Sequence, residues 1–192
     1  MPEGGGPRPR VREGGGRRPR AADDGGDAVA AVERFHAEGE AQAEPLRARH
    51  AARLACRRGC SACCIDGLSV FEVEAEVIRA RCAPVLREAP HPPGACAFLD
   101  ADGGCRIYAH RPYVCRTQGL PMRWIDYSAP DGAIDRRDVC PLNEAGEPIE
   151  TLPADACWEL GPWEGRLAQI QSACGGGALT RVPLRALFEP PA

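Results

Sequence analysis

Four cysteines fall within the nine residues from 56 to 64, in the pattern C-x3-C-x2-C-C. Such a dense run of thiols is what a soft or borderline metal ion requires of its ligands. Four further cysteines follow between residues 96 and 140. We therefore predict a metal centre of Zn²⁺ or iron, including a [4Fe–4S] cluster, with thiolate ligands. The candidate ligands are Cys56, Cys60, Cys63, Cys64, Cys96, Cys105, Cys115 and Cys140.

Composition favours a fold that needs such a centre. The chain has 192 residues, which corresponds to one domain plus appendages. Only 34 residues are Ile, Leu, Val or Phe, although the net charge is just −3. A thin apolar core of this kind is usually supplemented by disulfides or metals. The expected fold is α+β: a small metal-stapled domain with short helices and a β-hairpin, preceded by a disordered N-terminal tail.

Disulfides are the first alternative explanation for the cysteines. The chain has eleven of them, so complete pairing within one molecule is impossible. The N-terminus shows no apolar signal segment, and no stretch has the ~20 apolar residues of a membrane span. We therefore expect a cytoplasmic protein with no membrane partner, whose thiols stay reduced and free for metal. An exported chain would reverse this preference.

The chain divides into four expected parts. Residues 1–27 are rich in Gly, Arg and Pro and read as a disordered tail. Residues 28–55 read as a helical lead-in that Pro45 should break or kink. Residues 56–145 form the cysteine-cluster metal-binding domain, and residues 146–192 supply a C-terminal helix and an edge segment that pack on it.

Local signals refine these parts. Ser69 and Glu72 form a capping box, which predicts a helix from there to about Arg81, ended by Pro84. Alternating apolar residues around a Gly-rich turn predict a hairpin over 96–108. The remaining expected elements are a short helix at 111–116, a strand at 122–127, a helix at 160–173 and an edge segment at 182–184.

The cysteine pattern resembles that of the YkgJ-type cysteine-cluster proteins, which carry a zinc- or iron-chelating CxxCxxCC domain. The resemblance runs from Cys56 to about Cys140 and includes the segment Arg111-Pro112-x2-Cys115-Arg116. The usual first spacing is two residues, whereas three residues separate Cys56 from Cys60 here. The resemblance implies metal chelation and carries no defined activity with it.

Other residues were weighed as ligands or as charge compensation. Cys82, Cys157 and Cys174 lie outside the pattern and are expected to be packing residues. The four histidines stay off the ligand list. Several arginines adjoin the cysteines and can either offset thiolate charge or lie on the surface; they are Arg57, Arg58, Arg106, Arg111 and Arg116.

Several functions compete with simple chelation. The C-x3-C-x2-C spacing is also that of radical-SAM enzymes, but repeated strand–helix units are not visible here. Nucleic acid is not expected as a partner, because residues 28–192 are net acidic. The sequence favours a metal-binding protein of undefined cellular role over an enzyme. The alternative is an iron–sulfur modification enzyme, since the pattern also resembles flagellin lysine N-methylases; no protein partner is assigned.

Overall fold

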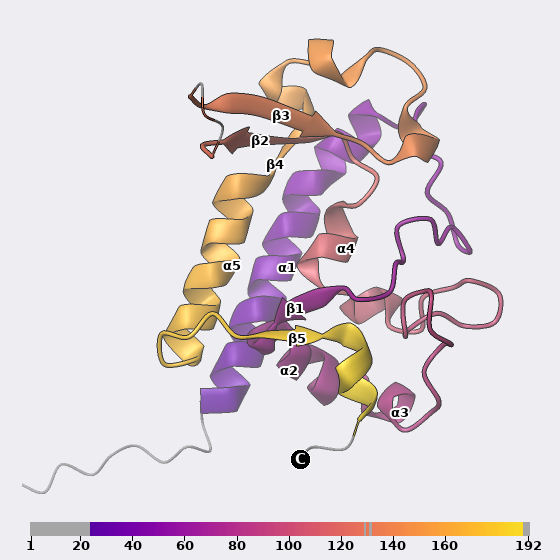
Figure 1. Cartoon of the computed structure of the whole chain (residues 1–192), viewed down its shortest axis with the longest axis vertical. Helices are drawn as coiled ribbons and strands as arrows, with labels where there is room; N and C mark the ends of the chain where they lie inside the picture. Colours follow the sequence, from indigo (N-terminus) through magenta and orange to yellow (C-terminus); the bar gives the residue numbers. More distant parts are fainter. Residues whose placement is uncertain (1–23, 129, 131, 190–192) are drawn as a thin grey trace, which may run out of the picture.

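Two long helices form the central framework of the fold. The computed structural model describes residues 24–189 apart from 129 and 131. Helix α1 (Asp24–Arg49) and helix α5 (Leu160–Cys174) lie side by side, and α2 (Glu72–Arg81) packs against both (Figure 1). The small sheets lie around this helical layer, so the expected α+β class is confirmed. Within the described ranges, none of the helices is long and apolar enough to cross a bilayer.

Helix α1 differs from its prediction at both ends. It begins at Asp24, so the last four residues assigned to the tail are helical, while residues 1–23 lie outside the described residues. It also continues through Pro45 to Arg49. An interior proline costs a helix about 3 kcal/mol. The neighbouring residues Ala43 and Leu46 pack on the core, and this burial offsets the cost.

The capping box predicted from Ser69 and Glu72 does not form, so this prediction is wrong. Residues Ser69–Phe71 form strand β1, which pairs antiparallel with β5 (Arg181–Pro183). Helix α2 therefore starts at Glu72, with Phe71 as its N-cap. It ends at Arg81 as predicted. Pro84 then lies in the first turn of a separate short helix, α3 (Ala83–Leu86), where its missing N–H is harmless.

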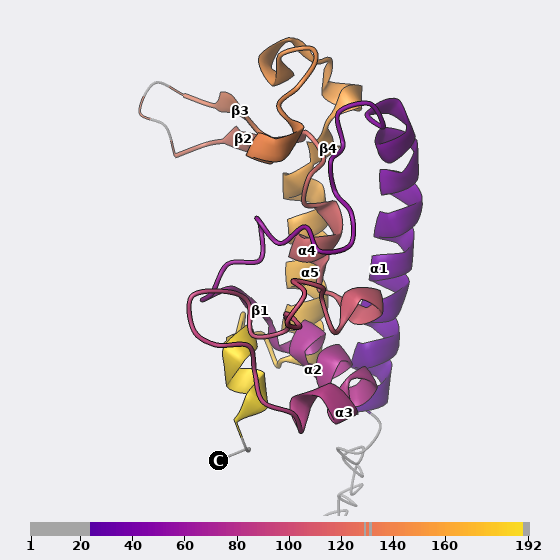
Figure 2. The ribbon, with the colours of Figure 1, turned by 90° about the vertical axis from the view of Figure 1, so that its right-hand side faces the viewer.

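A second sheet has the strand order β3-β2-β4. Its members are β2 (Met122–Asp126), β3 (Ile134–Asp138) and β4 (Trp158–Glu159). Strand β2 was predicted, whereas β3 was not. Arg123 on β2 pairs with Asp135 on β3 at 3.0 Å, so the charges of β3 are partly neutralised across the ladder. Figure 2 shows the β2–β3 hairpin projecting from the molecule.

The expected hairpin over 96–108 is reduced to a tight turn. One antiparallel bridge joins Leu99 to Cys105. The Asp100 carboxylate closes the turn by accepting hydrogen bonds from the backbone N–H groups of Asp102 and Gly104. The segment is therefore a side-chain-stabilised turn.

Helix α4 (Tyr113–Thr117) follows Pro112 and corresponds to the short helix expected at 111–116. Short 3-10 helices complete the chain. They are Tyr108–His110, Pro141–Asn143, Ile149–Thr151, Ala154–Ala156 and Leu184–Phe188.

The buried apolar residues form two main clusters. The first joins α1, α2 and α5 and contains the contacting aromatic side chains Phe35, Tyr113, Trp158 and Trp163. The second lies under β1, β5 and the 96–107 segment, around Ile78 and Phe98. Three candidate ligands belong to or pack on this second cluster: Cys64, Cys96 and Cys105.

Candidate metal centre

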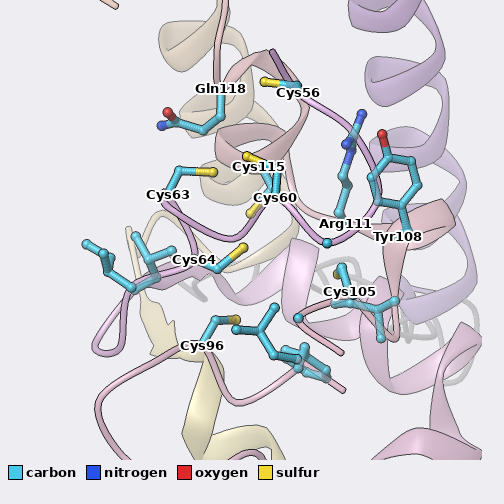
Figure 3. A pocket seen from close by; sticks show the side chains of 18 of the residues that line it. Cys56, Cys60, Cys63, Cys64, Cys96, Cys105, Tyr108, Arg111, Cys115 and Gln118 are labelled. Atoms are coloured by element: carbon cyan, nitrogen blue, oxygen red, sulfur yellow. The ribbon is translucent and has the colours of Figure 1, made fainter. Parts of the chain in front are cut away.

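Seven of the eight candidate cysteines line one cavity of about 670 Å³ (Figure 3). They come from three segments: the connection between α1 and β1, the 96–105 turn, and α4. The connection from α1 to β1 runs down one side of the helical layer (Figure 2). Its four cysteines line the cavity together with those of the other two segments. The lining cysteines are Cys56, Cys60, Cys63, Cys64, Cys96, Cys105 and Cys115.

The cavity is longer than a single metal site. Cys56 and Gln118 lie at one end and Cys96 at the other, with Cys60, Cys63 and Cys115 between them (Figure 3). Much of the remaining lining is apolar and includes Leu68, Phe98, Leu99, Ile107, Val114 and Leu184. The thiols are therefore spread along a mainly apolar wall.

Two glycine turns bring the cysteine segments together. Gly59 and Gly103 have φ values of +84° and +76°, a region that favours glycine. A Cβ on Gly103 would lie 3.3 Å from the Gly59 carbonyl oxygen, so the two turns are in close contact. Lower in the cavity, the Cys96 N–H donates to the Cys64 carbonyl at 2.9 Å. These contacts hold the 56–64 segment against the 96–105 turn.

Asn143 organises the Cys56 end. Its side chain is fully buried and contacts three segments. Its Oδ1 accepts from the Ala55 N–H at 2.8 Å, and its Nδ2 donates to the Gly119 carbonyl at 2.8 Å. The same Nδ2 lies 3.6 Å from the Cys56 sulfur. Donors that point at a ligand sulfur fix its orientation and stabilise the thiolate.

Cys140 does not line the cavity. Its carbonyl oxygen instead accepts the Asn143 N–H at 2.7 Å and opens the 3-10 helix Pro141–Asn143. Cys140 therefore contributes to the Cys56 end through its backbone, by placing Asn143.

The thiols of the cavity have very different acidities. A hydrogen bond with Cys64, helped by the charge of Arg111, lowers the pKa of Cys63 to about 6. The same contact raises the pKa of Cys64. Burial raises the pKa of Cys115 to about 12, and burial also raises the pKa values of Cys96 and Cys105. Without a cation, Cys63 is the thiolate this environment favours.

Helix α4, which carries Cys115, is held in place by a carboxylate on α2. The buried Glu74 on α2 accepts the Tyr113 N–H at 2.7 Å and contacts His36 Nε2 at 3.0 Å. The carboxylate thus caps the first turn of α4. His36 is committed to this contact, and none of the four histidines, all within the described ranges, lines the cavity.

Seven thiols are suitable ligands for a thiophilic ion, although their sulfur atoms are not close enough together to bind one ion in this arrangement. Across the part of the chain that the structure describes, no three His, Cys, Asp or Glu side chains are grouped closely enough to hold one ion as they stand. Zn–S bonds are about 2.3 Å long. Binding would therefore require the cysteine segments to close inward.

The remaining predicted residues separate into distinct roles. Cys82 and Cys157 are buried and do not line the cavity, and Cys174 is exposed at the end of α5. Arg57, Arg58 and Arg111 line the cavity, whereas Arg106 bonds to Ala97 and Glu88. Sequence reasoning missed Asn143, Gly119, Gln118 and Glu74. Asn143 lies three residues after Cys140, and Gln118 and Gly119 lie three and four residues after Cys115, so these three had a signal by their proximity to a motif cysteine. Glu74 had none.

Comparison with known proteins agrees with this site. No curated protein and no solved structure matches the chain significantly. A family model named CxxCxxCC, with the description "Putative zinc- or iron-chelating domain", matches residues 55–141. That range includes all seven cysteines of the cavity and Cys140. Residues 55–141 thus match the CxxCxxCC family model, which supports the resemblance to the cysteine-cluster proteins.

Proposed function

We propose that this protein binds zinc or iron through thiolates of the cysteine cavity. The supporting observation is that seven cysteines, drawn from three separate segments, line a single cavity. Cysteine thiolates are ligands for Zn²⁺ and for iron–sulfur centres. The proposal includes a compartment that keeps thiols reduced, which for this chain is the cytoplasm.

The proposed ligand set is the seven lining cysteines, with Cys140 in a supporting position. Seven thiols exceed one four-coordinate site, so two ions sharing sulfurs, or one cluster with spare thiols, both suit the number. Thiolates around a divalent ion leave a negative centre. The guanidinium groups of Arg57, Arg58 and Arg111 on the same cavity wall would offset that charge.

The decisive experiment is metal analysis and absorption spectroscopy of the full chain, purified anaerobically. Stoichiometric zinc would give no visible band, because Zn²⁺ is d¹⁰. A broad visible band that bleaches on reduction would identify an iron–sulfur cluster. The Cys60→Ser variant is expected to lose metal, and Cys157→Ser, a buried thiol outside the cavity, serves as its matched control.

The proposal is contradicted if purified protein contains no stoichiometric metal and its cavity thiols alkylate readily in native buffer. It is also contradicted if Cys60→Ser and Cys157→Ser retain the same metal content.

A cluster-bearing modification enzyme is the second candidate. The observation that favours it is the size of the cavity, about 670 Å³, which lies in the roughly 300–1,000 Å³ range of small-molecule sites. A purely structural ion needs no such space beside it. Substrate-dependent change in the spectrum of the bound centre would move this candidate to first place.

A further inference from the structure

A second hollow, of about 410 Å³, adjoins the cysteine cavity on the α1 side. Three arginines and one carboxylate lie around it: Arg47 and Glu40 from α1, Arg111 just before α4, and Arg116 within it. We call this group the arginine hollow. Its side chains carry a formal charge of +2, which the exposed Glu44, 3.7 Å from Arg47, reduces only at the outer edge.

Glu40 holds the three guanidinium groups together. It lies 2.8 Å from Arg47, 3.0 Å from Arg116 and 3.5 Å from Arg111. Burial alone would raise the pKa of Glu40, but the three arginines outweigh it and lower the pKa below its usual value. Glu40 is therefore an anion already bound by the hollow, and it neutralises only one of three cationic groups.

The arginines differ in how far the fold uses them. Arg116 is fully engaged, because its Nε and Nη2 donate to the Arg111 and Ala109 carbonyls and its Nη1 donates to Glu40. Arg111 is less engaged. Its distance to Glu40 is the longest of the three arginine–Glu40 distances, and its buried Nε has no hydrogen-bond partner. Arg116 serves the architecture of the hollow, whereas Arg111 retains donors for a ligand.

Arg111 also connects the hollow to the cysteine cavity. Arg111 and Tyr108 line both spaces. The Arg111 guanidinium lies 4.1 Å from the centre of the Tyr108 ring, and this cation–π contact restrains it beside the ring (Figure 3). A planar guanidinium fixed in this way is suited to bidentate binding of an oxyanion.

We propose that the arginine hollow and the cysteine cavity together bind a small organic phosphate. The phosphate group would lie against Arg111 and Arg47, and its apolar body would enter the cavity beside Leu99, Ile107 and Val114. A phosphate dianion matches the +2 charge of the hollow, whereas a carboxylate supplies one charge. The phosphate contact does not rest on the metal proposal, since no cysteine belongs to the hollow. The apolar body would share the cavity with the cysteines, so its binding is compared at matched metal content.

The test is calorimetric titration of the full-length protein with phenyl phosphate, inorganic phosphate and benzoate at low ionic strength. Phenyl phosphate is expected to bind more tightly than either other probe. Arg111→Gln should weaken its affinity at least about tenfold, since a charged hydrogen bond contributes about 1.5–3 kcal/mol. Arg166→Gln is the matched control: Arg166 pairs with Glu38 on the α1–α5 face and should change affinity less than about twofold.

A variant that binds phenyl phosphate more tightly would show that the arginines bind a ligand and do not only support the fold. Glu40→Gln removes the competing carboxylate, so phenyl phosphate should bind at least about threefold more tightly. The same ligand should also raise the melting temperature of Glu40→Gln more than that of the wild type. If the arginines only support the fold, Glu40→Gln lowers stability and the ligand does not restore it.

Three results would overturn the proposal. The first is no phenyl phosphate binding at about 10 mM, well above a millimolar Kd. The second is equal affinity in wild type and Arg111→Gln at matched metal content. The third is a probe that binds as tightly as phenyl phosphate. Equal affinity for benzoate would show that the dianionic phosphate is not recognised, and equal affinity for inorganic phosphate would show that the apolar body is not.

Discussion

The adjacent thiols Cys63 and Cys64 have pKa values that move in opposite directions because they share one proton. The pKa of Cys63 falls to about 6, so its thiolate forms as the pH rises through that value and is complete above it. A thiol with the ordinary pKa of about 8.5 is only about 0.3% ionised at pH 6. Cys63 is also exposed to solvent. It is therefore the most reactive position expected in metal-free protein.

We predict that iodoacetamide alkylates Cys63 first. After allowance for the lower nucleophilicity of a more acidic thiolate, the rate near pH 6.5 should exceed that of an ordinary thiol about fivefold. Peptide mass spectrometry against time measures this, with the exposed Cys174 as internal comparison. Equal modification of Cys63 and Cys174 at that pH would contradict the shared-proton arrangement.

Gly119 is the residue against which Cys56 packs. Its φ is +94°, and a Cβ there would lie 2.6 Å from the Cys56 sulfur and 3.0 Å from Asn143 Nδ2. Gly119→Ala should therefore destabilise the protein by about 2 kcal/mol or more, combining backbone strain with displacement of the sulfur. Metal content should fall with it. Denaturant unfolding and metal analysis are the measurements.

Gly94→Ala is the matched control for this substitution. Gly94 has φ +103° with open space around its Cβ position, so it carries the backbone penalty without the contact. Retention of full metal content in Gly119→Ala would show that the Cys56 sulfur is free to move.

At the scale of elements, the end of the cavity that holds Cys56 depends on Asn143. This side chain ties the beginning of the connection from α1 to β1 to the residues that follow α4. Asn143→Ala removes both bonds and leaves the partly buried Ala55 N–H and the buried Gly119 carbonyl without them. Each group left unsatisfied costs about 1–3 kcal/mol, so a loss of about 2–5 kcal/mol is expected. Urea unfolding measures it. A loss under about 1 kcal/mol would mean that water replaces the amide.

Pattern reasoning found the elements whose apolar residues recur regularly. The helix ending at Arg81, the helix expected at 160–173 and the strand expected at 122–127 are present, because their periodicity matches their packing. The last two end at Cys174 and Asp126 in the structure. Strand β3 was missed because Asp and Arg fill it, and its stability comes from pairing with β2. The capping box at Ser69 was overridden because β1 pairs with β5, more than a hundred residues away in sequence.

The candidate site shows the same division. Clustered cysteines were recognisable as a group from spacing alone, and seven of them line one cavity. The absence of Cys140 from the cavity lining could not be read from the spacing. The meeting of Glu40 with Arg111 depends on how α1 packs against α4 and the residues before it. Such contacts between distant segments have no local signature. The arginines beside the cysteines were visible in the sequence, whereas the hollow they form with α1 was not.

For the whole molecule, the two apolar clusters imply different dependence on metal. The described members of the first cluster include no cysteine, and its aromatic contacts join α1 to α5. The second cluster includes Cys96 and has Cys64 and Cys105 packed on it. Structural zinc sites supply about 10–16 kcal/mol of apparent binding energy, comparable with the ~5–15 kcal/mol net stability of a domain. Loss of metal should therefore loosen the second cluster and spare the helical one.

We predict that Cys60→Ser and Cys115→Ser each lose metal and expose apolar surface, since one missing thiolate opens the coordination shell. Far-ultraviolet circular dichroism should retain most of the helical signal of α1 and α5, while binding of a hydrophobic dye increases. Chelation of metal from the wild type should produce the same state. Cys174→Ser should do neither, because Cys174 is exposed at the end of α5 away from the cavity. A Cys60→Ser protein that loses metal yet melts like the wild type would show that the centre serves chemistry and contributes little to the fold.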